Sequence, residues 1–461
     1  MTITIFALST PPGIGALAIV RLSGPGALGA LQSLSGQMNF TPRQATRVIL
    51  CNHHPGPAVP DHWSGTKPES RYPEQLDDGL AVYFPAPYSF TGEDIVELTL
   101  HGGRATTQGV LGALGAMSDL RLAEPGEFTR RAFENGKMDL TQAEAIADLI
   151  HAETVQQRQQ ALSQLSGTLS DLYQGWAARL TALLAHAEAD IDFADEDLPA
   201  DILAAQHQAI EKLISELQEH LSDNRRGERL RDGITIAIVG APNAGKSTLL
   251  NVLAQRDVAI VTDIAGTTRD VLEVHFDLGG YPVTLLDTAG LRETSDVIES
   301  EGIRRARERA TRADLKLCLF DAGAEPDEAT RALIDGSAIV VMTKLETGSW
   351  KSDKNPFLAP SLQIPISAHT GAGIAELLQT ITQKLEEIFH QPREAPSLTR
   401  ARHRTALEDA MAALQRAAAA QVPELRAEDL RLALRAIGRI TGRVDVEDLL
   451  DQIFSEFCIG K

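Results

Sequence analysis

The stretch ITIAIVGAPNAGKST, residues 234–248, decides the fold of the central part of this chain. An apolar run rich in β-branched residues leads directly into G-x-x-x-x-G-K-[ST], and LLNVLAQ then continues as a helix. A strand, a glycine-rich loop and a helix in this order are the context that a phosphate-binding loop requires. Gly240 and Gly245 let the loop curl so that backbone N–H groups point at phosphate oxygens, and the helix N-terminus adds positive potential. Lys246 can reach the outer phosphates, and the Ser247 hydroxyl can hold Mg²⁺.

Motifs downstream of the loop favour GTP over ATP. LLDTAG ends in the D-x-x-G motif (287–290) that follows a strand in GTPases, where the glycine amide senses the γ-phosphate. GTTRD (266–270) lies between these motifs as a candidate switch with Thr268 as second Mg²⁺ ligand, and ISAH (366–369) matches a base-contacting loop. The predicted GTP-binding residues are Asn243, Ala244, Gly245, Lys246, Ser247, Thr248, Thr262, Asp263, Ile264, Ala265, Gly266, Thr267, Thr268, Asp287, Thr288, Ala289, Gly290, Ser367, Ala368 and His369.

Two features depart from the usual GTPase pattern. Guanine selection usually depends on N-K-x-D after a strand, but here the strand AIVVM is followed by TKLE, so Thr343 replaces Asn and Glu346 replaces Asp. The carboxylate is kept on a side chain one methylene longer, which predicts weaker selectivity or affinity for guanine. Leu291 stands where many small GTPases carry a water-positioning Gln. Another group must therefore orient the attacking water, and Glu299 is the candidate.

Composition limits the class of protein and its compartment. The 461 residues leave room for about three domains. No apolar run reaches the ~18–20 residues that span a bilayer, and the start lacks the basic region of a signal peptide. Cys51, Cys318 and Cys458 are too far apart for a disulfide framework, which predicts a reducing cytoplasm. CNHH (51–54) has no second ligand cluster at finger spacing, so zinc is not predicted.

The charge of the chain bears on nucleic acid as a partner. A formal net charge of −20 argues against broad electrostatic capture of RNA or DNA. Basic residues nevertheless cluster at 225–231, 304–312 and 399–404. A solvated helix face is the ordinary interpretation of each cluster. If the protein meets RNA, we expect it to do so through such patches or together with a more basic partner.

The sequence pattern divides the chain into four segments. Residues 1–120 combine short strand-like runs with a helix, and residues 121–228 are helical in pattern, with a capping box predicted at TQAE (141–144). Residues 229–392 alternate buried-strand runs with helical stretches, which is typical of a doubly wound, mainly parallel sheet. Helices resume over 393–461. The predicted fold is therefore α/β multidomain: an N-terminal α+β domain, a helical bundle, and a P-loop GTPase domain inserted into that bundle.

Several segments, in order over residues 8–461, resemble the tRNA modification GTPases called MnmE or TrmE. They are STPPGIGALAIVRLSG, FTGEDIVELTLHGG, PGEFTRRAFENGKMDLTQAEAIADLI, GAPNAGKSTLLN, VTDIAGTTRDVL, DTAGLRE and FCIGK. The resemblance implies an N-terminal domain that binds folate and dimerises, a helical domain, and an inserted G domain. It also implies an FAD-dependent partner of the MnmG (GidA) type, in a heterotetramer or larger assembly.

The activity that this resemblance implies is modification of certain tRNAs. The family adds aminomethyl or carboxymethylaminomethyl groups to carbon 5 of the wobble uridine, using a one-carbon unit from 5-formyl- or 5,10-methylene-tetrahydrofolate, with FAD only in the partner. By motif, folate contacts fall on Arg21, Glu97, Lys137 and Lys461. Potassium ligands fall on Asn243, Thr262, Ile264 and Thr267, Mg²⁺ on Ser247 and Thr268, and the water-orienting role on Glu299.

Cys458, in the motif FCIGK, allows three interpretations. A lipidation signal fits poorly, since Gly460 and Lys461 suit the C-a-a-X pattern badly and no second membrane signal lies upstream. A Cys packed near a helix end remains open. The favoured interpretation is a working thiol, because a nearby Lys461 would lower its pKa. Its task would be addition to carbon 6 of uracil, although residues of the partner could also do this.

A GTP-switched ribosome-assembly factor is the main alternative function. In such a protein the flanking domains would serve only as adaptors. Folate affinity separates the two hypotheses, because an assembly factor has no use for Arg21, Glu97 and Lys461 around a pterin.

Overall fold

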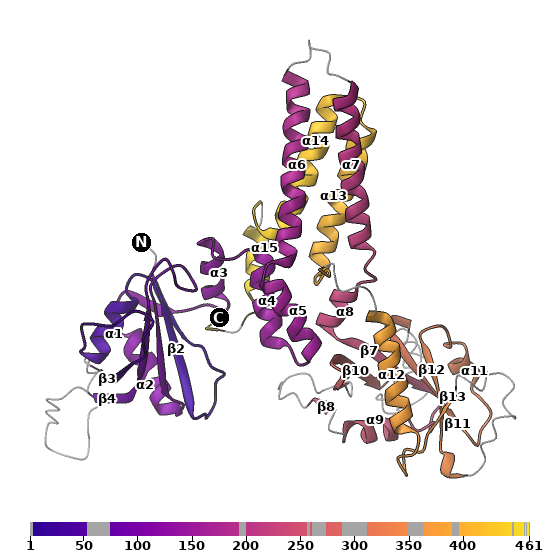
Figure 1. Ribbon diagram of the computed structural model, residues 1–461. Coiled ribbons are helices and arrows are strands. Elements are labelled where there is room, and N and C mark those ends of the chain that lie inside the picture. The colour runs from indigo at the N-terminus through magenta and orange to yellow at the C-terminus, as the bar shows by residue number, and fades with distance from the viewer. Residues whose placement is uncertain are drawn as a thin grey trace, which may run out of the picture. The chain divides into compact units, whose positions relative to one another are not determined.

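The computed structural model describes residues 3–52, 74–192, 200–255, 259–260, 273–287, 311–347, 363–389, 396–444, 447–455, 457 and 459–460 (Figure 1). The chain forms two compact units. The first combines residues 1–147 with residues 438–461, and the second comprises residues 148–437. The second unit is therefore inserted between two segments of the first.

A six-stranded sheet forms the centre of the first unit, in the order β3-β4-β5-β2-β1-β6. Neighbouring strands are antiparallel, except that β6 runs parallel to β1. The strands are β1 (Thr4–Leu8), β2 (Leu17–Ser23), β3 (Thr46–Asn52), β4 (Glu74–Phe84), β5 (Ile95–His101) and β6 (Leu120–Leu122).

Helices lie on both faces of this sheet. The helices α1 (Ala27–Ser35) and α2 (Arg104–Gly115) cover one face and share a core with Phe6. Because side chains alternate along a strand, the neighbouring Ile5 points to the other face, where it packs on Phe128 of α3 (Glu127–Glu134). One face is thus fully covered by helices, and α3 covers part of the other.

The C-terminal segment completes the first unit. The helix α15 (Glu447–Ser455) packs through Phe454 against α4 (Leu140–His151). Beyond it, Ile459 forms an antiparallel bridge with Pro125. Gly460 adopts a φ of +95°, and a Cβ there would lie 2.4 Å from the Leu8 carbonyl oxygen, so only glycine fits this approach.

The predicted capping box at Thr141–Glu144 is wrong. The helix α4 begins at Leu140, and Thr141 is fully buried inside its first turn. Asp139 caps the helix instead: its Oδ1 accepts from the Gln142 N–H at 3.0 Å, and the Gln142 Oε1 accepts from the Asp139 N–H at 3.1 Å. The reciprocal pair is the one that a capping box requires, two positions earlier than predicted.

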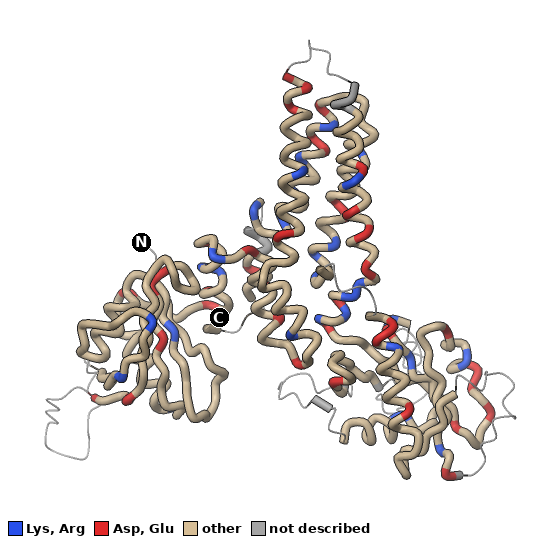
Figure 2. The backbone as a smooth tube through the Cα atoms, viewed as in Figure 1, with Lys and Arg blue, Asp and Glu red and all other residues tan. Residues whose placement is uncertain are grey.

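The second unit contains a helical bundle. Its long helices run side by side, and acidic and basic residues are interleaved along them (Figure 1, Figure 2). Tyr173, Trp176 and Leu180 recur at helical spacing on the buried side of α6. The helices are α5 (Val155–Leu165), α6 (Thr168–Asp192), α7 (Ala200–Leu221), α8 (Arg226–Asp232), α13 (Ala401–Ala419) and α14 (Pro423–Thr441).

A seven-stranded sheet in the same unit has the order β13-β12-β11-β7-β10-β9-β8. The strands from β13 to β10 are parallel, whereas β9 is antiparallel to both of its neighbours. The predicted doubly wound, mainly parallel sheet is confirmed. The strands are β7 (Ile234–Gly240), β8 (Ala259–Ile260), β9 (Glu273–Leu278), β10 (Tyr281–Asp287), β11 (Leu315–Asp321), β12 (Ala338–Thr343) and β13 (Gln363–Pro365), and the helices are α9 (Lys246–Ala254), α11 (Glu328–Arg331) and α12 (Ile374–Phe389).

No helix in the described ranges is both long enough and apolar enough to cross a membrane.

Candidate functional site

The phosphate loop lies between β7 and α9, at the carboxyl end of the parallel strands. Open α/β sheets bind their ligands at this edge. Gly240 is the residue at which the loop leaves the sheet. A Cβ there would lie 2.7 Å from the Leu319 carbonyl oxygen of β11, so only glycine fits at this position. Asn243 and Gly245 have φ values of +63° and +91°, a conformation that Asn and Gly tolerate best. These positions curl the loop over the start of the helix.

The loop holds its own lysine. The Lys246 side chain is 8 % exposed, and its Nζ donates to the carbonyls of Gly240 at 2.8 Å and Ala241 at 2.9 Å. The ammonium is therefore fixed next to the loop backbone, where phosphate oxygens would also lie. Ser247 and Thr248 are exposed in the first turn of α9, so their hydroxyls are accessible to a ligand or a hydrated cation.

Asp287 belongs to the same edge of the sheet. It is the last residue of β10, which pairs in parallel with β7, and its register partner is Ile238. The first residue of the D-x-x-G motif therefore lies one strand away from the start of the phosphate loop.

Thr343 connects the base-binding side of the domain to the phosphate loop. It is the last residue of β12 and is 3 % exposed. Its hydroxyl donates to the Ala244 carbonyl at 2.8 Å, and the Phe320 carbonyl oxygen lies 3.2 Å away. The threonine that replaces the usual Asn thus still holds the phosphate loop. The sequence alone does not predict this role, because the contact joins residues that are 99 positions apart.

The residues that follow Thr343 form two polar contacts, one from Lys344 and one from Glu346. Lys344 has a φ of +61°, and its Nζ pairs with Asp321 Oδ2 at 2.7 Å, which lowers the pKa of that carboxyl. Glu346 is exposed in a 3₁₀ turn (345–347), and a hydrogen bond from the buried Ser367 hydroxyl lowers its pKa. Ser367 therefore brings the ISAH loop against the carboxylate that replaces the usual Asp, while His369 is exposed beside them.

A second constellation lies on the sheet of the first unit. Arg21 of β2 and Glu97 of β5 are register partners, and their side chains form an ion pair with N–O distances of 2.8 and 2.9 Å. The guanidinium carbon lies 5.8 Å from the ring centres of both Phe90 and Phe128. The pair is only partly exposed, at 18 % for Arg21 and 28 % for Glu97, so it forms a polar spot between aromatic rings.

The helix α3 that carries Phe128 is held by charged groups. Arg131 is buried and contacts Glu127 and Glu93, each at 3.0 Å. Burial would raise the pKa of Glu127, but hydrogen bonds from Arg121, from the Glu124 N–H and from Arg131 bring it below its ordinary value. Glu127 therefore stays ionised and fixes the helix beneath the sheet.

Two more segments approach the Arg21 pair. Lys137 is exposed, and its Nζ donates to the Pro87 carbonyl at 2.9 Å, on the loop that also carries Phe90. The Ser9 hydroxyl donates to the Gly460 carbonyl at 3.0 Å, close to Ala7, the residue of β1 that faces Arg21 in the register. The loop 85–94 thus places Phe90 against Arg21, and the C-terminal segment contacts Ser9, just after β1 and two residues beyond the register partner of Arg21.

Comparison with known proteins identifies the family of this chain. Residues 4–137 match the family model described as GTP-binding protein TrmE N-terminus, and residues 140–458 match the MnmE helical domain. The chain belongs to the MnmE family of tRNA modification GTPases. It is 52 % identical to the tRNA modification GTPase MnmE of Parvibaculum lavamentivorans over 99 % of this chain and 100 % of that protein. It is also 52 % identical to the MnmE of Rhodospirillum rubrum, over 99 % of each chain.

Among solved structures, the G domain of the FeoB iron transporter of T. maritima is similar to part of this chain. The likeness has 26 % sequence identity and a TM-score of 0.25, and it covers 34 % of this chain and 98 % of that one.

Several residues that the sequence analysis of this MnmE-family protein singled out lie outside the described residues. They are Thr262, Asp263, Ile264, Ala265, Gly266, Thr267, Thr268, Thr288, Ala289, Gly290, Leu291, Glu299, Cys458 and Lys461. Within the described ranges, no group of three or more His, Cys, Asp or Glu side chains could hold a metal ion. Cys318 is buried in the sheet of the second unit, which raises the pKa of its thiol to about 11, so it is an inert core residue.

Proposed function

We propose that this GTPase works with an FAD-dependent subunit of the MnmG or GidA type and adds aminomethyl or carboxymethylaminomethyl groups to carbon 5 of the tRNA wobble uridine. The one-carbon unit would come from 5-formyl- or 5,10-methylene-tetrahydrofolate. The observation that carries this proposal is the Arg21–Glu97 pair, placed between two aromatic rings in a unit that is separate from the GTPase sheet.

The residues of this pair suit a pterin. A pterin ring is flat and carries adjacent hydrogen-bond donors and acceptors on one edge. The Glu97 carboxylate can accept from ring N–H groups, the Arg21 guanidinium can donate to ring acceptors, and the exposed Phe90 can contact a ring face, while the buried Phe128 supports the guanidinium from the core. Lys137 and Lys461 would supply positive charge for the carboxylates of the folate tail. Folate would supply the carbon, and these residues would hold and orient it.

The residues of the second unit suit GTP with its cations. The loop N–H groups and Lys246 would bind the phosphates, and Ser247 with Thr268 would hold Mg²⁺. Asn243, Thr262, Ile264 and Thr267 would provide neutral oxygens for potassium, because a large, weakly hydrated ion accepts such ligands. Residues 229–392 would form the G domain, within helical segments at 121–228 and 393–461, after the folate domain at 1–120.

Three further residues complete the proposal. Glu299 would orient the attacking water in place of the missing Gln. Cys458 would act as a thiolate that forms a bond to carbon 6 of the uracil, which makes carbon 5 nucleophilic toward the folate carbon. Lys461, at the end of the same motif, would favour the thiolate by its positive charge.

We also propose a homodimer in the cytoplasm. Leu17, Ile49 and Leu80 are 62 %, 47 % and 44 % exposed and share one face of the sheet with Arg21 and Glu97, as the strand register shows. An exposed apolar sheet face of this kind is typical of a protein–protein interface. A second copy of the chain on this face would also shield the folate site from water.

The test is mass analysis of wobble nucleosides in tRNA from a deletion strain that carries plasmid copies of the gene. We expect the deletion to lose the modification, the unaltered copy to restore it, and Arg21→Ala to fail. Arg104→Ala is a matched control, because Arg104 is exposed at the start of α2, the helix that covers the opposite face of the same sheet. Unchanged wobble uridines in the deletion strain would refute the proposal, and a ribosome-assembly defect in their place would favour the alternative function.

A further inference from the structure

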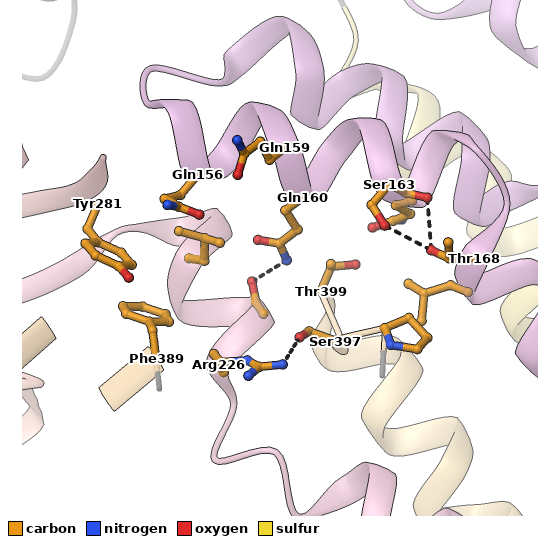
Figure 3. A pocket seen from close by; sticks show the side chains of 15 residues that line it. Gln156, Gln159, Gln160, Ser163, Thr168, Arg226, Tyr281, Phe389, Ser397 and Thr399 are labelled. Atoms are coloured by element: carbon orange, nitrogen blue, oxygen red, sulfur yellow. Dashed lines mark hydrogen bonds between the residues drawn. The ribbon is translucent and has the colours of Figure 1, made fainter. Parts of the chain in front are cut away.

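A cleft of about 330 Å³ lies in the second unit, away from the phosphate loop (Figure 3). The helix α5 forms one wall, and α8 with the segment 396–399 forms the opposite wall. The wall around α8 is tightly built, since a Cβ on Gly227 would lie 2.2 Å from the Leu398 carbonyl oxygen. This cleft falls in the lower part of the range of small-molecule sites, roughly 300–1,000 Å³.

The α5 wall presents side-chain amides. Gln156, Gln160 and Gln164 line the cleft at intervals of four residues, which places them on one face of the helix. Figure 3 shows the first two of them. The Gln160 Nε2 donates to the Gly227 carbonyl at 3.0 Å. Its Oε1 is buried and accepts no hydrogen bond from the described part of the chain. A ligand that offers an N–H or O–H group would satisfy this oxygen.

The opposite wall carries a second buried polar atom. Thr399 is 2 % exposed, lines the cleft, and its Oγ1 has no hydrogen-bond partner within the described ranges. A buried hydroxyl without a hydrogen-bond partner destabilises the folded chain, because it has lost its hydrogen bonds to water. Two such atoms on facing walls, Gln160 Oε1 and Thr399 Oγ1, indicate a cleft built for a polar ligand.

Arg226 supplies positive charge, and none of the described carboxylates forms an ion pair with it. Its neighbours in the basic cluster 225–231 are ion-paired: Arg225 with Glu228, Arg229 with Asp314, and Arg231 with Asp232. Arg226 instead donates to the Ser397 hydroxyl at 2.8 Å and lines the cleft (Figure 3). Among the described residues that line the cleft, none carries a carboxylate. The cleft therefore favours a ligand with a negative group.

Aromatic rings close one end of the cleft. Tyr281 of β10 and Phe389 of α12 are stacked, with ring centroids 4.8 Å apart and an angle of 12° between the planes. Figure 3 shows both rings beside Gln156. Such a pair offers flat apolar surface next to the amides.

We propose that this cleft binds a nucleotide, with its base against the glutamine amides and its phosphate on Arg226. Side-chain amides combine a donor and an acceptor and so read the edges of bases, aromatic rings stack on bases, and arginine binds phosphate in a forked geometry. The nucleotide comes either from an unstacked position of a tRNA or from a free nucleoside monophosphate, and both present the same chemistry. The site is independent of the folate chemistry proposed above.

The experiment measures binding to the full chain that has been saturated with GDP and Mg²⁺, so that the GTP site is filled. The probes are UMP, CMP and AMP by calorimetry, and an unmodified tRNA transcript by fluorescence titration. We expect Arg226→Met to weaken binding at least fivefold and to reduce the salt dependence of tRNA binding by about one phosphate contact. Thr399→Val keeps the shape of the side chain and should weaken binding of the probes at least twofold. Arg158→Met is the matched control, because Arg158 is exposed on α5 and does not line the cleft.

The two probes distinguish the sources of the ligand. Weaker tRNA binding by both cleft variants, with no mononucleotide binding at millimolar concentration, assigns the site to RNA. Mononucleotide binding that both variants weaken assigns it to a free nucleotide. Equal affinities for the unaltered chain and Thr399→Val, with thermal unfolding unchanged, overturn the proposal for either source. Binding is read without folate or partner, so failure here leaves the wobble-uridine proposal untouched.

Discussion

In the second unit, the groups that face the phosphates come from one unbroken stretch, 240–248, whereas in the first unit Arg21 and Glu97 meet across two strands from positions 76 residues apart. The phosphate loop works mainly through its backbone, and its shape depends on Gly240, Asn243 and Gly245. The Arg21–Glu97 site works through side chains on a regular sheet. A backbone site tolerates side-chain changes at most positions but few changes of conformation, while a side-chain site should respond to each truncation separately.

The largest effect is expected at Lys246, the charged side chain of the phosphate loop. Lys246→Ala removes the ammonium that the loop carbonyls hold next to the phosphates. We expect GTP hydrolysis to slow by ~10²–10³-fold, as for loss of a preorganised electrostatic contact. Binding of 5-formyl-tetrahydrofolate should stay unchanged, because Arg21 lies in the other unit. Parallel loss of both activities would show that the two units do not act separately.

The converse change tests the side-chain site. Arg21→Ala removes the charged partner of Glu97. It should weaken the binding of 5-formyl-tetrahydrofolate by about 10- to 100-fold, since hydrogen bonds to charged groups contribute ~1.5–3 kcal/mol. Glu97→Gln should have a smaller effect because its amide keeps one acceptor. Calorimetry measures the affinity, and GTP turnover serves as the control. Unaltered folate affinity in Arg21→Ala would remove the site from the proposed function.

The third prediction concerns the potassium ion proposed to bind at the phosphate loop. Asn243 has a left-handed φ and is exposed at the loop, so its side-chain oxygen is accessible to an ion. We expect Asn243→Ala, or replacement of potassium by sodium, to slow GTP turnover at least tenfold, in line with the electrostatic loss above, with little change in nucleotide binding. Steady-state hydrolysis at matched ionic strength measures this. Equal turnover in the two salts would exclude potassium from the mechanism.

A smaller effect on GTP binding is expected from Thr343, whose side chain contacts the backbone of the phosphate loop. Thr343→Val keeps the shape of the buried residue but removes the hydroxyl that donates to Ala244. Loss of one such hydrogen bond costs ~1–1.5 kcal/mol, which corresponds to about five- to twelvefold weaker GTP binding. Thr343→Ser should keep most of the affinity. Dissociation rates of a fluorescent GTP analogue provide the measurement, and a Thr343→Val rate equal to the unaltered one would show that the tether does not matter.

The smallest expected effect concerns guanine. Glu346→Asp restores the shorter side chain of the usual motif. It should tighten GTP binding roughly twofold to fivefold, which is a smaller effect than the gain or loss of one hydrogen bond to a charged group. Competition between GTP and ATP analogues reads the selectivity. No change, or a weaker affinity, would mean that Glu346 is not the residue that accepts hydrogen bonds from guanine.

The same contrast explains what could be predicted from the sequence. The phosphate loop was evident because its chemistry lies in consecutive residues between a strand and a helix, and the parallel sheet followed from buried-strand runs. The contact from Thr343 to Ala244 spans 99 positions, and no local pattern marks it. Arg21 and Glu97 were named through family resemblance, because their pairing depends on a strand register that a single sequence does not reveal.

The helix start at Asp139 shows a different limit. Both Asp139 with Gln142 and Thr141 with Glu144 have the spacing of a capping box, so local pattern could not choose between them. Packing decided the outcome: Thr141 and Glu144 are buried in the first unit, which leaves Asp139 at the helix end. The nucleotide cleft was equally hidden, because Gln160, Arg226 and Thr399 come together only in the folded second unit.

The hydrogen bond between Ser9 and Gly460 joins positions that are 451 residues apart. During synthesis, residues 438–460 leave the ribosome only after the whole second unit has been made. Until then the first unit is incomplete. Its strands have been made, but Leu8 and Pro125 lack their contacts with the C-terminal segment. Closing so long a loop adds little entropic cost beyond that of a shorter one, since the cost grows only with the logarithm of loop length. The consequence is a built-in order of maturation: a chain interrupted between the end of α12 at Phe389 and residue 438 would contain the whole parallel sheet with its phosphate loop, yet it would lack the segment that completes the first unit.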